Sequence, residues 1–132
     1  MNQAEKNKQF MIDFYKLGSG QEKTEEMLRQ YTNNERYIGH VMFMEKAFPE
    51  YQLVPDEIIA EGDKVFVRAR VVAKHKGEVD GIPPTFKDIN VPFAIGYRIE
   101  ENMIVDFWTI SDQMEFLEQL GMAREQVEVR PE

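Results

Sequence analysis

The chain has 132 residues and a mass of 15.5 kDa, a size typical of one domain that buries a core without disulfide or metal support. It carries 24 acidic and 16 basic residues, a formal net charge of −8, and this negative charge argues against a nucleic-acid partner. It contains no cysteine, which excludes thiol nucleophiles, iron–sulfur clusters and zinc ribbons and fits a cytoplasmic location.

The first part of the chain has the apolar periodicity of helices. Residues 3–17 are predicted to form one helix, and residues 22–31 a second, shorter one. A third helix begins after Asn33 or Asn34, either of which can cap it, and ends at Pro49. This third helix carries an apolar stripe formed by Tyr37, Val41, Met44 and Phe48.

Beyond residue 50 the apolar period changes to about two, which indicates strands. Four antiparallel strands are expected, and a loop rich in glycine and proline, residues 77–87, separates the second from the third. The strands are residues 51–60, 65–74, 91–99 and 103–110. A last helix is predicted over residues 113–120, ended by Gly121.

This order of elements predicts an α+β domain over residues 1–121, followed by a polar tail, residues 122–132. Helices grouped on one side of a curved sheet leave a conical cavity between the two layers. The N-terminal residues are polar and no apolar run approaches about 20 residues, so neither a secretory signal nor a membrane span is expected.

Asp112 stands where the last strand gives way to the last helix, and two roles are open to it. Side chains on one face of a strand recur every second residue, so Asp112 shares a face with Asp106, Trp108 and Ile110. If that face lines the cavity, apolar surroundings would raise the carboxyl pKa of Asp112 toward the range of a general acid–base catalyst. Alternatively, Asp112 caps the helix through the amide of Glu115.

The two histidines are candidates for contact with a ligand oxygen. His75 has the parity of the apolar residues in strand 65–74, so it should face inward. There it either polarises or orients a substrate group, or is a core-edge histidine satisfied by a backbone carbonyl. His40 borders the apolar stripe of the third helix, near Tyr37 and Met44, where it either positions an oxygen or is a boundary residue with one solvated nitrogen. The histidines lie far apart and lack ligand-like carboxylate spacing, so no metal site is expected.

Trp108, the sole tryptophan, either fills the core or forms a stacking wall for a flat ligand. Asp106, if it faces inward, lies at the pocket or is paired with Arg98 or Arg68. The expected pocket residues are therefore Trp108, Asp106, Ile110, Tyr37 and Met44.

Several short segments occur in a distinctive order: Phe48-Pro49-Glu50-Tyr51, residues 59–65, His75-Lys76-Gly77-Glu78, residues 81–85, Tyr97-Arg98-Ile99, a W-x-x-x-D motif at Trp108 and Asp112, and Gln119-Leu120-Gly121. Together they resemble the SnoaL-like polyketide cyclase (ester cyclase) family. The sequence departs from that family at Phe86, where glycine is usual, at Ala73-Lys74, where Gly-Thr is usual, and at Asp106-Phe107, where Glu-His is commoner.

The resemblance implies an NTF2-like cone, often dimeric through its sheet. It also implies a pocket carboxylate that exchanges a proton, without metal or organic cofactor, during the intramolecular aldol ring closure of a polyketide ester. On that basis Asp112 is the expected general acid/base, His75 and His40 position an oxygen, and Trp108 forms a wall. The alternative is a non-catalytic module that binds a small molecule or dimerises. The expected partners are a small molecule and a second copy of the chain.

Overall fold

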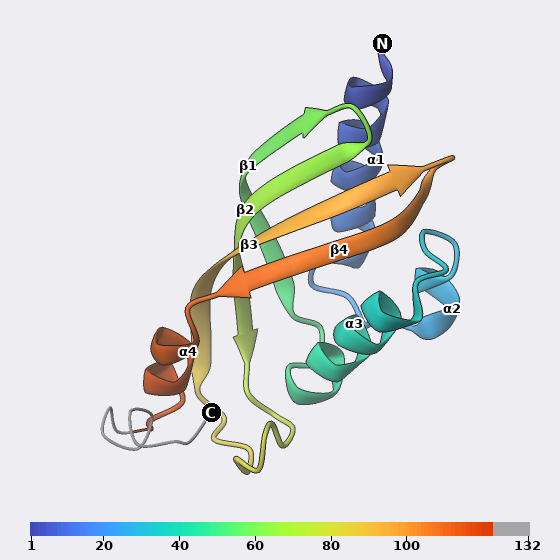
Figure 1. Cartoon of the computed structure of the whole chain (residues 1–132). Helices are drawn as coiled ribbons and strands as arrows, with labels where there is room; N and C mark the ends of the chain where they lie inside the picture. The colour runs from blue at the N-terminus through green and yellow to red at the C-terminus, as the bar shows by residue number, and fades with distance from the viewer. Residues whose placement is uncertain (123–132) are drawn as a thin grey trace.

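The structure of the chain is a computed structural model that describes residues 1–122. The predicted order of an α+β domain is confirmed (Figure 1). The elements are α1 (Gln3–Gly18), α2 (Glu25–Leu28), α3 (Glu35–Ala47), β1 (Gln52–Glu61), β2 (Lys64–Lys74), β3 (Asp88–Glu100), β4 (Met103–Ser111) and α4 (Gln113–Gln119). The predicted tail lies outside the described residues apart from Met122. Within residues 1–122, none of the helices has the length and apolar character needed to cross a membrane.

Side-chain caps set where the helices begin. Asn2 Oδ1 accepts a hydrogen bond from the Glu5 amide at 2.8 Å, and Asn34 Oδ1 accepts one from the Tyr37 amide at 2.9 Å. Of the two asparagines that could cap the third helix, Asn34 is therefore the one that does so.

The second helix is much shorter than predicted, because tertiary contacts hold both of its flanks. Before it, Lys23 is buried, and its ammonium group donates a hydrogen bond to the backbone oxygen of Tyr51. After it, the hydroxyl of Thr32 donates to the backbone oxygen of Ile104 at 2.7 Å. These contacts fix the chain on either side of α2 in conformations that do not continue the helix.

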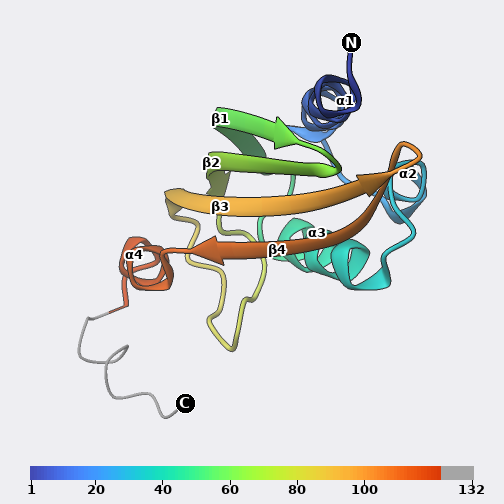
Figure 2. The same cartoon turned by 45° about the horizontal axis from the view of Figure 1, so that its top comes forward.

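The four strands form one antiparallel sheet in the order β1-β2-β3-β4, joined as predicted by consecutive connections along the chain (Figure 2). The turn between β3 and β4 places both Glu101 and Asn102 at positive φ, the geometry of a tight hairpin. The strands bend strongly along their length, so that the sheet has a concave and a convex face (Figures 1 and 2).

The core lies between the concave face of the sheet and the helices. Helix α1 packs against β1 and β2, and the short helix α4 packs against β3. The inward residues of β2 alternate along the strand and are all buried, namely Val65, Val67, Ala69 and Val71. Helices α1 and α3 contribute the buried residues Met11, Phe14, Tyr15, Tyr37, Ile38 and Val41.

Three tyrosine hydroxyls meet within this core, and we call them the tyrosine cluster. The hydroxyl of Tyr97, on β3, lies 2.6 Å from that of Tyr15, on α1, and 3.3 Å from that of Tyr37, on α3. Burial raises the pKa of all three phenols above their usual range. Burial raises the pKa of the neighbouring Tyr51 as well.

The loop between β2 and β3 is anchored on the end of α3. The amides of Lys76 and Gly77 both donate to the backbone oxygen of Ala47, at 3.0 and 2.9 Å. Phe86, which replaces the glycine usual in the family, has a φ of 58°. That left-handed conformation favours glycine, so Phe86 adopts a backbone geometry suited to the residue it replaces.

The substitution Gly77→Ala is expected to lower the free energy of unfolding by about 1–3 kcal/mol, because the added Cβ would collide with the backbone oxygen of Lys46. Gly39→Ala is the matched control. Its Cβ meets nothing within 4 Å and lies in helix α3, so this change should raise stability by about 0.5–1 kcal/mol. Urea denaturation measures both, and similar effects of the two changes would contradict the packing at Gly77.

We expect the free energy of unfolding to fall as the pH rises above about 10, because the unfolded chain then ionises tyrosines that the folded chain keeps protonated. Each tyrosine of the cluster should contribute on the order of 1 kcal/mol between pH 10 and 11. Lys23 has the opposite effect at lower pH, because burial lowers its pKa in the folded chain to about 8. Between pH 8 and about 10.4 the folded chain has lost this proton and the unfolded chain still holds it, so the free energy of unfolding rises with pH over that range.

Urea denaturation of the wild type and of Tyr15→Phe at pH 10 and 11 isolates the effect of the tyrosines. The fall should be smaller in Tyr15→Phe by on the order of 1 kcal/mol. An equal fall in the two proteins would show that Tyr15 ionises alike in the folded and unfolded chains.

Candidate functional site

A pocket of about 490 Å³ lies between the concave face of the sheet, helix α3 and helix α4. Its walls come from alternate residues of two paired strands. Strand β3 contributes Val91, Phe93, Ile95 and Tyr97, and β4 contributes Thr109 and Ser111. The volume falls in the range of small-molecule sites, and the lining is mostly apolar with a few polar groups.

The strand register gives the pocket two distinct ends. Tyr97 pairs with Phe107 at one end, and Phe93 pairs with Ser111 at the other. Tyr97 lies four positions after Phe93, a distance of roughly 13 Å along an extended strand. Tyr97 and Tyr37 thus bring the tyrosine cluster to one end of the pocket, while Ser111 and Gln113 lie where β4 passes into α4.

His40 is brought into the pocket, one turn of α3 beyond Tyr37, and Met44 lies one turn further on. The imidazole ring of His40 packs against Phe107 with 5.5 Å between ring centroids. Burial, and secondarily the positive charge of Arg36, lower the pKa of His40 below its usual value. Within residues 1–122 the imidazole makes no side-chain hydrogen bond, so a mainly neutral ring is free to accept a proton from a ligand.

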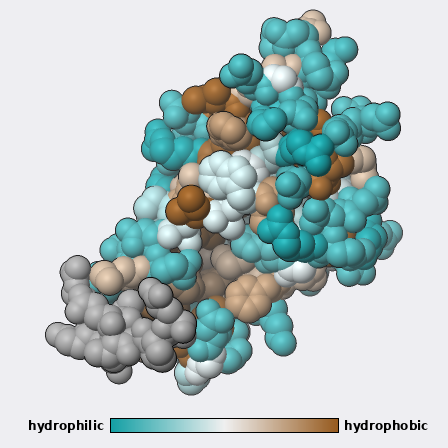
Figure 3. Space-filling model, viewed as in Figure 1, coloured by the Kyte–Doolittle hydropathy of each residue, from teal (hydrophilic) through white to brown (hydrophobic). Residues whose placement is uncertain are grey.

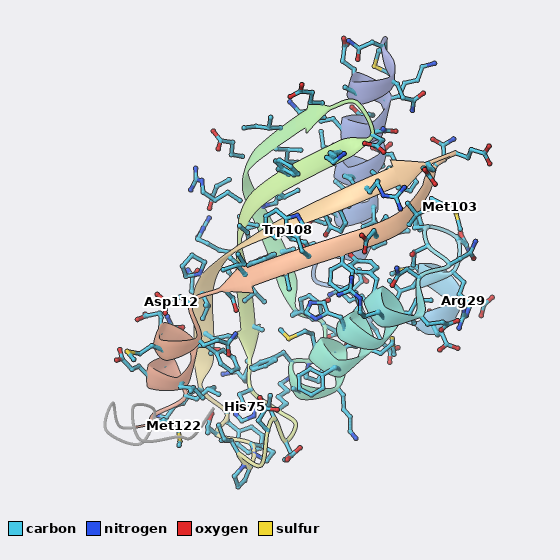
Figure 4. The ribbon with its side chains drawn as sticks, in the orientation of Figure 1. Arg29, His75, Met103, Trp108, Asp112 and Met122 are labelled. Atoms are coloured by element: carbon cyan, nitrogen blue, oxygen red, sulfur yellow. The ribbon has the colours of Figure 1, made fainter. Side chains whose placement is uncertain are left out.

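Asp112 occupies the N-cap position of α4. Its Oδ1 accepts a hydrogen bond from the Glu115 amide at 3.0 Å, and the side chain is exposed to solvent. Both neighbours, Ser111 and Gln113, line the pocket, but Asp112 does not. Figure 4 shows Asp112 at the junction of β4 and α4. The capping role is therefore present, and proton transfer by Asp112 stays a prediction.

The expectation that Trp108, Ile110 and Asp106 line the pocket is wrong, because β4 turns its other face inward. Phe107 is buried and Thr109 and Ser111 line the cavity, whereas Trp108 and Ile110 are 47% and 69% exposed on the convex face. In Figure 4 Trp108 lies over the face of the sheet turned toward the viewer. It lies against Gly96 of the neighbouring strand, where a Cβ would collide with the indole ring.

Asp106 is paired with Arg36, and not with Arg98 or Arg68 as the sequence suggested. Arg36 Nη2 lies 3.1 Å from Asp106 Oδ1 and donates a second hydrogen bond to the backbone oxygen of Phe107 at 2.7 Å. The guanidinium carbon lies 4.2 Å from the centroid of the Phe107 ring. Arg36 therefore ties α3 to β4 beside Phe107.

His75 is fully buried, as its parity predicted, but it is not among the residues that line the pocket. Its Nδ1 accepts a hydrogen bond from the Thr85 amide at 3.1 Å, and its ring centroid lies 5.3 Å from that of Phe48. Nε2 has no hydrogen-bond partner in the described part of the chain. The contacts of His75 fix the loop after β2, and a direct role at the ligand stays a prediction.

Sequence reasoning named Tyr37 and Met44 as pocket residues and His40 as a catalytic one, and it missed Tyr97, Thr109, Ser111 and Gln113. A signal for Tyr97 was available, because it continues the alternation of Val91, Phe93 and Ile95 on one face of β3. Thr109 and Ser111 were missed because the opposite face of β4 was placed inward. Residues 1–122 hold no group of three or more carboxylate or histidine side chains placed for a metal ion.

Comparisons with solved structures show the fold. AclR from Streptomyces galilaeus, a candidate hydroxylase, is 20% identical over 95% of this chain and 89% of its own, with a TM-score of 0.76. A candidate SnoaL-like polyketide cyclase from Jannaschia sp. CCS1 is 18% identical over 93% of this chain and 97% of its own, with a TM-score of 0.78. IdmH from Streptomyces antibioticus, a candidate polyketide cyclase, is 23% identical over 92% and 100% of the chains, with a TM-score of 0.69.

These likenesses confirm the expected NTF2-like cone. No curated protein gives a significant match to the sequence. The sequence profile of the SnoaL-like polyketide cyclases, however, matches residues 19–120, which include all four strands and the residues that line the pocket. The chain therefore belongs to the SnoaL-like polyketide cyclase family.

Proposed function

We propose that this protein is an acid–base enzyme that acts on an uncharged, apolar molecule bearing a carbonyl oxygen. The observation that carries the proposal is a largely apolar pocket of about 490 Å³ with a neutral histidine in its wall. Among its lining residues Asp80 is the one carboxylate, and lysine and arginine are absent from the lining within residues 1–122. Such a pocket disfavours an anionic ligand, because a buried anion would lack a positively charged partner, and its largely apolar wall favours an uncharged one.

The proposed chemistry is removal of a proton from the carbon next to the carbonyl group. The C–H bond breaks, its electron pair forms an enolate, and the proton passes to a ring nitrogen of His40. His40 suits this role because it lines the pocket in its neutral form and makes no side-chain hydrogen bond in residues 1–122. The enolate carbon can then bond to a second carbonyl carbon of the same molecule, whose π electron pair moves to its oxygen, and that oxygen takes the proton back from His40. This is the aldol ring closure that is implied by the family.

In this mechanism His40 takes the role that sequence reasoning gave to Asp112. A base must come within hydrogen-bond distance of the proton that it removes, or reach it through one water. Asp112 is exposed and engaged with the Glu115 amide, whereas His40 lines the cavity. Asp112 remains next to two lining residues, so a ligand that extends past Ser111 would pass close to its carboxylate.

A second function, non-catalytic binding of the same class of molecule, is favoured by one observation. The carboxylate that the family resemblance assigned to catalysis serves as a helix cap outside the pocket lining. A binding protein would keep the apolar cavity and its polar groups and would leave the bound carbonyl compound unchanged.

The exchange of α-protons with deuterated water separates the two functions. With 2-acetylnaphthalene as the probe, the wild type should accelerate exchange at the methyl group, as measured by proton NMR. His40→Gln should reduce the protein-dependent rate by about 100-fold or more, the usual contribution of a general base. Since the pKa of His40 lies below its usual value of about 6.5, the loss of the wild-type rate in acid should have its midpoint below that pH.

Asp112→Asn is the matched comparison, because asparagine also caps helices and the fold should be kept. We expect this variant to exchange at close to the wild-type rate. Loss of exchange in Asp112→Asn with exchange retained in His40→Gln would move the base to Asp112. Absence of wild-type acceleration while the ketone binds would favour the binding protein.

We further propose that the chain forms a homodimer through the convex face of its sheet. Ile59, Phe66, Gly96 and Trp108 are cross-strand neighbours in one row, which we call the outer apolar row. Ile59 and Phe66 are 56% and 46% exposed, and the rings of Phe66 and Trp108 lie 5.9 Å apart. Figure 3 shows apolar and pale surface over this face of the sheet, with hydrophilic surface on either side. Contiguous exposed apolar surface of this kind marks interaction sites.

Trp108→Lys should therefore convert the protein to a monomer, which sedimentation velocity measures against the 15.5 kDa chain mass. The control is Leu17→Lys, because Leu17 is another exposed apolar residue, 46% accessible, that belongs to helix α1 and not to the sheet. A wild type that sediments as a monomer, or a Trp108→Lys variant that stays dimeric, would contradict the proposed interface.

A further inference from the structure

The tyrosine cluster has one more proton than its internal hydrogen bonds can use. Three hydroxyl groups carry three protons, and the cluster contains two hydrogen bonds, between Tyr97 and Tyr15 and between Tyr97 and Tyr37. None of the three hydroxyls makes another hydrogen bond within residues 1–122. One O–H group is therefore left without an acceptor, whichever way the two bonds are oriented.

The surroundings decide where that proton can be used. Tyr37 and Tyr97 line the pocket of about 490 Å³, whereas Tyr15 does not. Tyr15 and Tyr37 both border a second cavity of about 20 Å³, which is close to the size of a single water molecule. Tyr97 is therefore the member of the cluster that lines the ligand-sized pocket and not the small cavity, and Tyr37 lines both. Tyr15, whose hydroxyl lies 2.6 Å from that of Tyr97, can donate to it.

We propose that Tyr97 and Tyr37 form a hydrogen-bond-donating subsite for the carbonyl oxygen of the ligand, and that Tyr15 positions Tyr97 within it. The inference deepens the proposed function, because it names the atom of the ligand that the pocket receives. When Tyr15 donates to Tyr97, the Tyr97 hydroxyl can donate to the ligand oxygen. It can instead donate to Tyr37, whose hydroxyl then donates to the ligand oxygen. Hydrogen bonds linked in this way polarise one another, which strengthens the last donor.

The same subsite suits the proton transfer assigned to His40. As the α-proton leaves, negative charge moves to the carbonyl oxygen, and fixed donors in an apolar site stabilise that charge without reorganising. His40 and Tyr37 lie one turn apart on α3 and both pack against Phe107, with 5.5 and 4.9 Å between ring centroids. The base and the donors are therefore held at the same end of the pocket. The hydroxyls donate hydrogen bonds and keep their protons throughout.

A matched pair of probes tests the subsite without any turnover. 2-Acetylnaphthalene carries a carbonyl acceptor, and 2-ethylnaphthalene has nearly the same shape without one. Equilibrium dialysis with the full chain should show the ketone bound more tightly by roughly threefold to tenfold, the usual net effect of one hydrogen bond. The infrared carbonyl stretch of the bound ketone should lie below its frequency in an apolar solvent.

Three phenylalanine variants then locate the donor. Tyr97→Phe should abolish the preference for the ketone and return the carbonyl stretch to its apolar-solvent frequency. Tyr37→Phe should reduce both, and Tyr15→Phe should weaken the infrared shift although Tyr15 does not line the pocket. Tyr31→Phe is the control, because Tyr31 packs against Phe14 outside the pocket lining and should leave both readouts unchanged.

Equal affinity for the two probes in the wild type would overturn the subsite, as would an infrared shift that survives in Tyr97→Phe. If Tyr97→Phe does not fold, Tyr37→Phe and Tyr15→Phe decide by the same readouts. Failure of the proposed function is distinguishable. A preference for the ketone without α-proton exchange would support the subsite and contradict the proposed enzyme activity. Exchange without a preference for the ketone would support the enzyme activity and contradict the subsite.

Discussion

The packing of one aromatic ring, that of Phe107, decides how the last strand presents its side chains. Tyr37 and His40 of α3 lie against this ring, and the guanidinium group of Arg36 lies over it while holding its backbone oxygen. Because side chains alternate along a strand, burying Phe107 sends Thr109 and Ser111 into the pocket and leaves Trp108 and Ile110 outside. A strand turned over by one residue would bury Asp106 and expose Phe107, which is unfavourable for both residues. The pocket wall and the outer apolar row therefore follow from the same contact.

The interior of the pocket combines polar groups with very little charge. Burial keeps the tyrosine hydroxyls protonated and His40 mainly neutral, so these groups offer hydrogen-bond donors and a proton acceptor without carrying a charge. A negatively charged ligand would lose its hydration and find no lysine or arginine among the described lining residues. An uncharged carbonyl compound would meet a donor for its oxygen and a base for the neighbouring proton, and this is the combination that enolate chemistry requires.

The concave face of the sheet lines the pocket and the convex face carries the outer apolar row, and β3 contributes to both. Tyr97 points from this strand into the tyrosine cluster, and its neighbour Gly96 gives Trp108 room on the convex side. A side chain at Gly96 would collide with the indole ring, so the glycine is required by close packing and not by a turn. A partner that docks on the outer apolar row would therefore rest on the strand that carries Tyr97. The ligand site and the proposed dimer contact share one rigid element of the fold.

The sequence by itself determined the order of the elements, the α+β class and the family. These features rest on local periodicity, on caps such as Asn34 and on the order of short motifs, all of which act within one segment. It also placed Tyr37, His40 and Met44 together, because helical spacing alone puts them on neighbouring turns of α3. Tertiary structure decided the length of α2, the partner of Asp106 and the face of β4 that points inward. Alternation divides a strand into two sets of residues without saying which set is buried. On β4 both sets contain large apolar side chains, so the choice depended on contacts with α3, some 70 residues earlier in the chain.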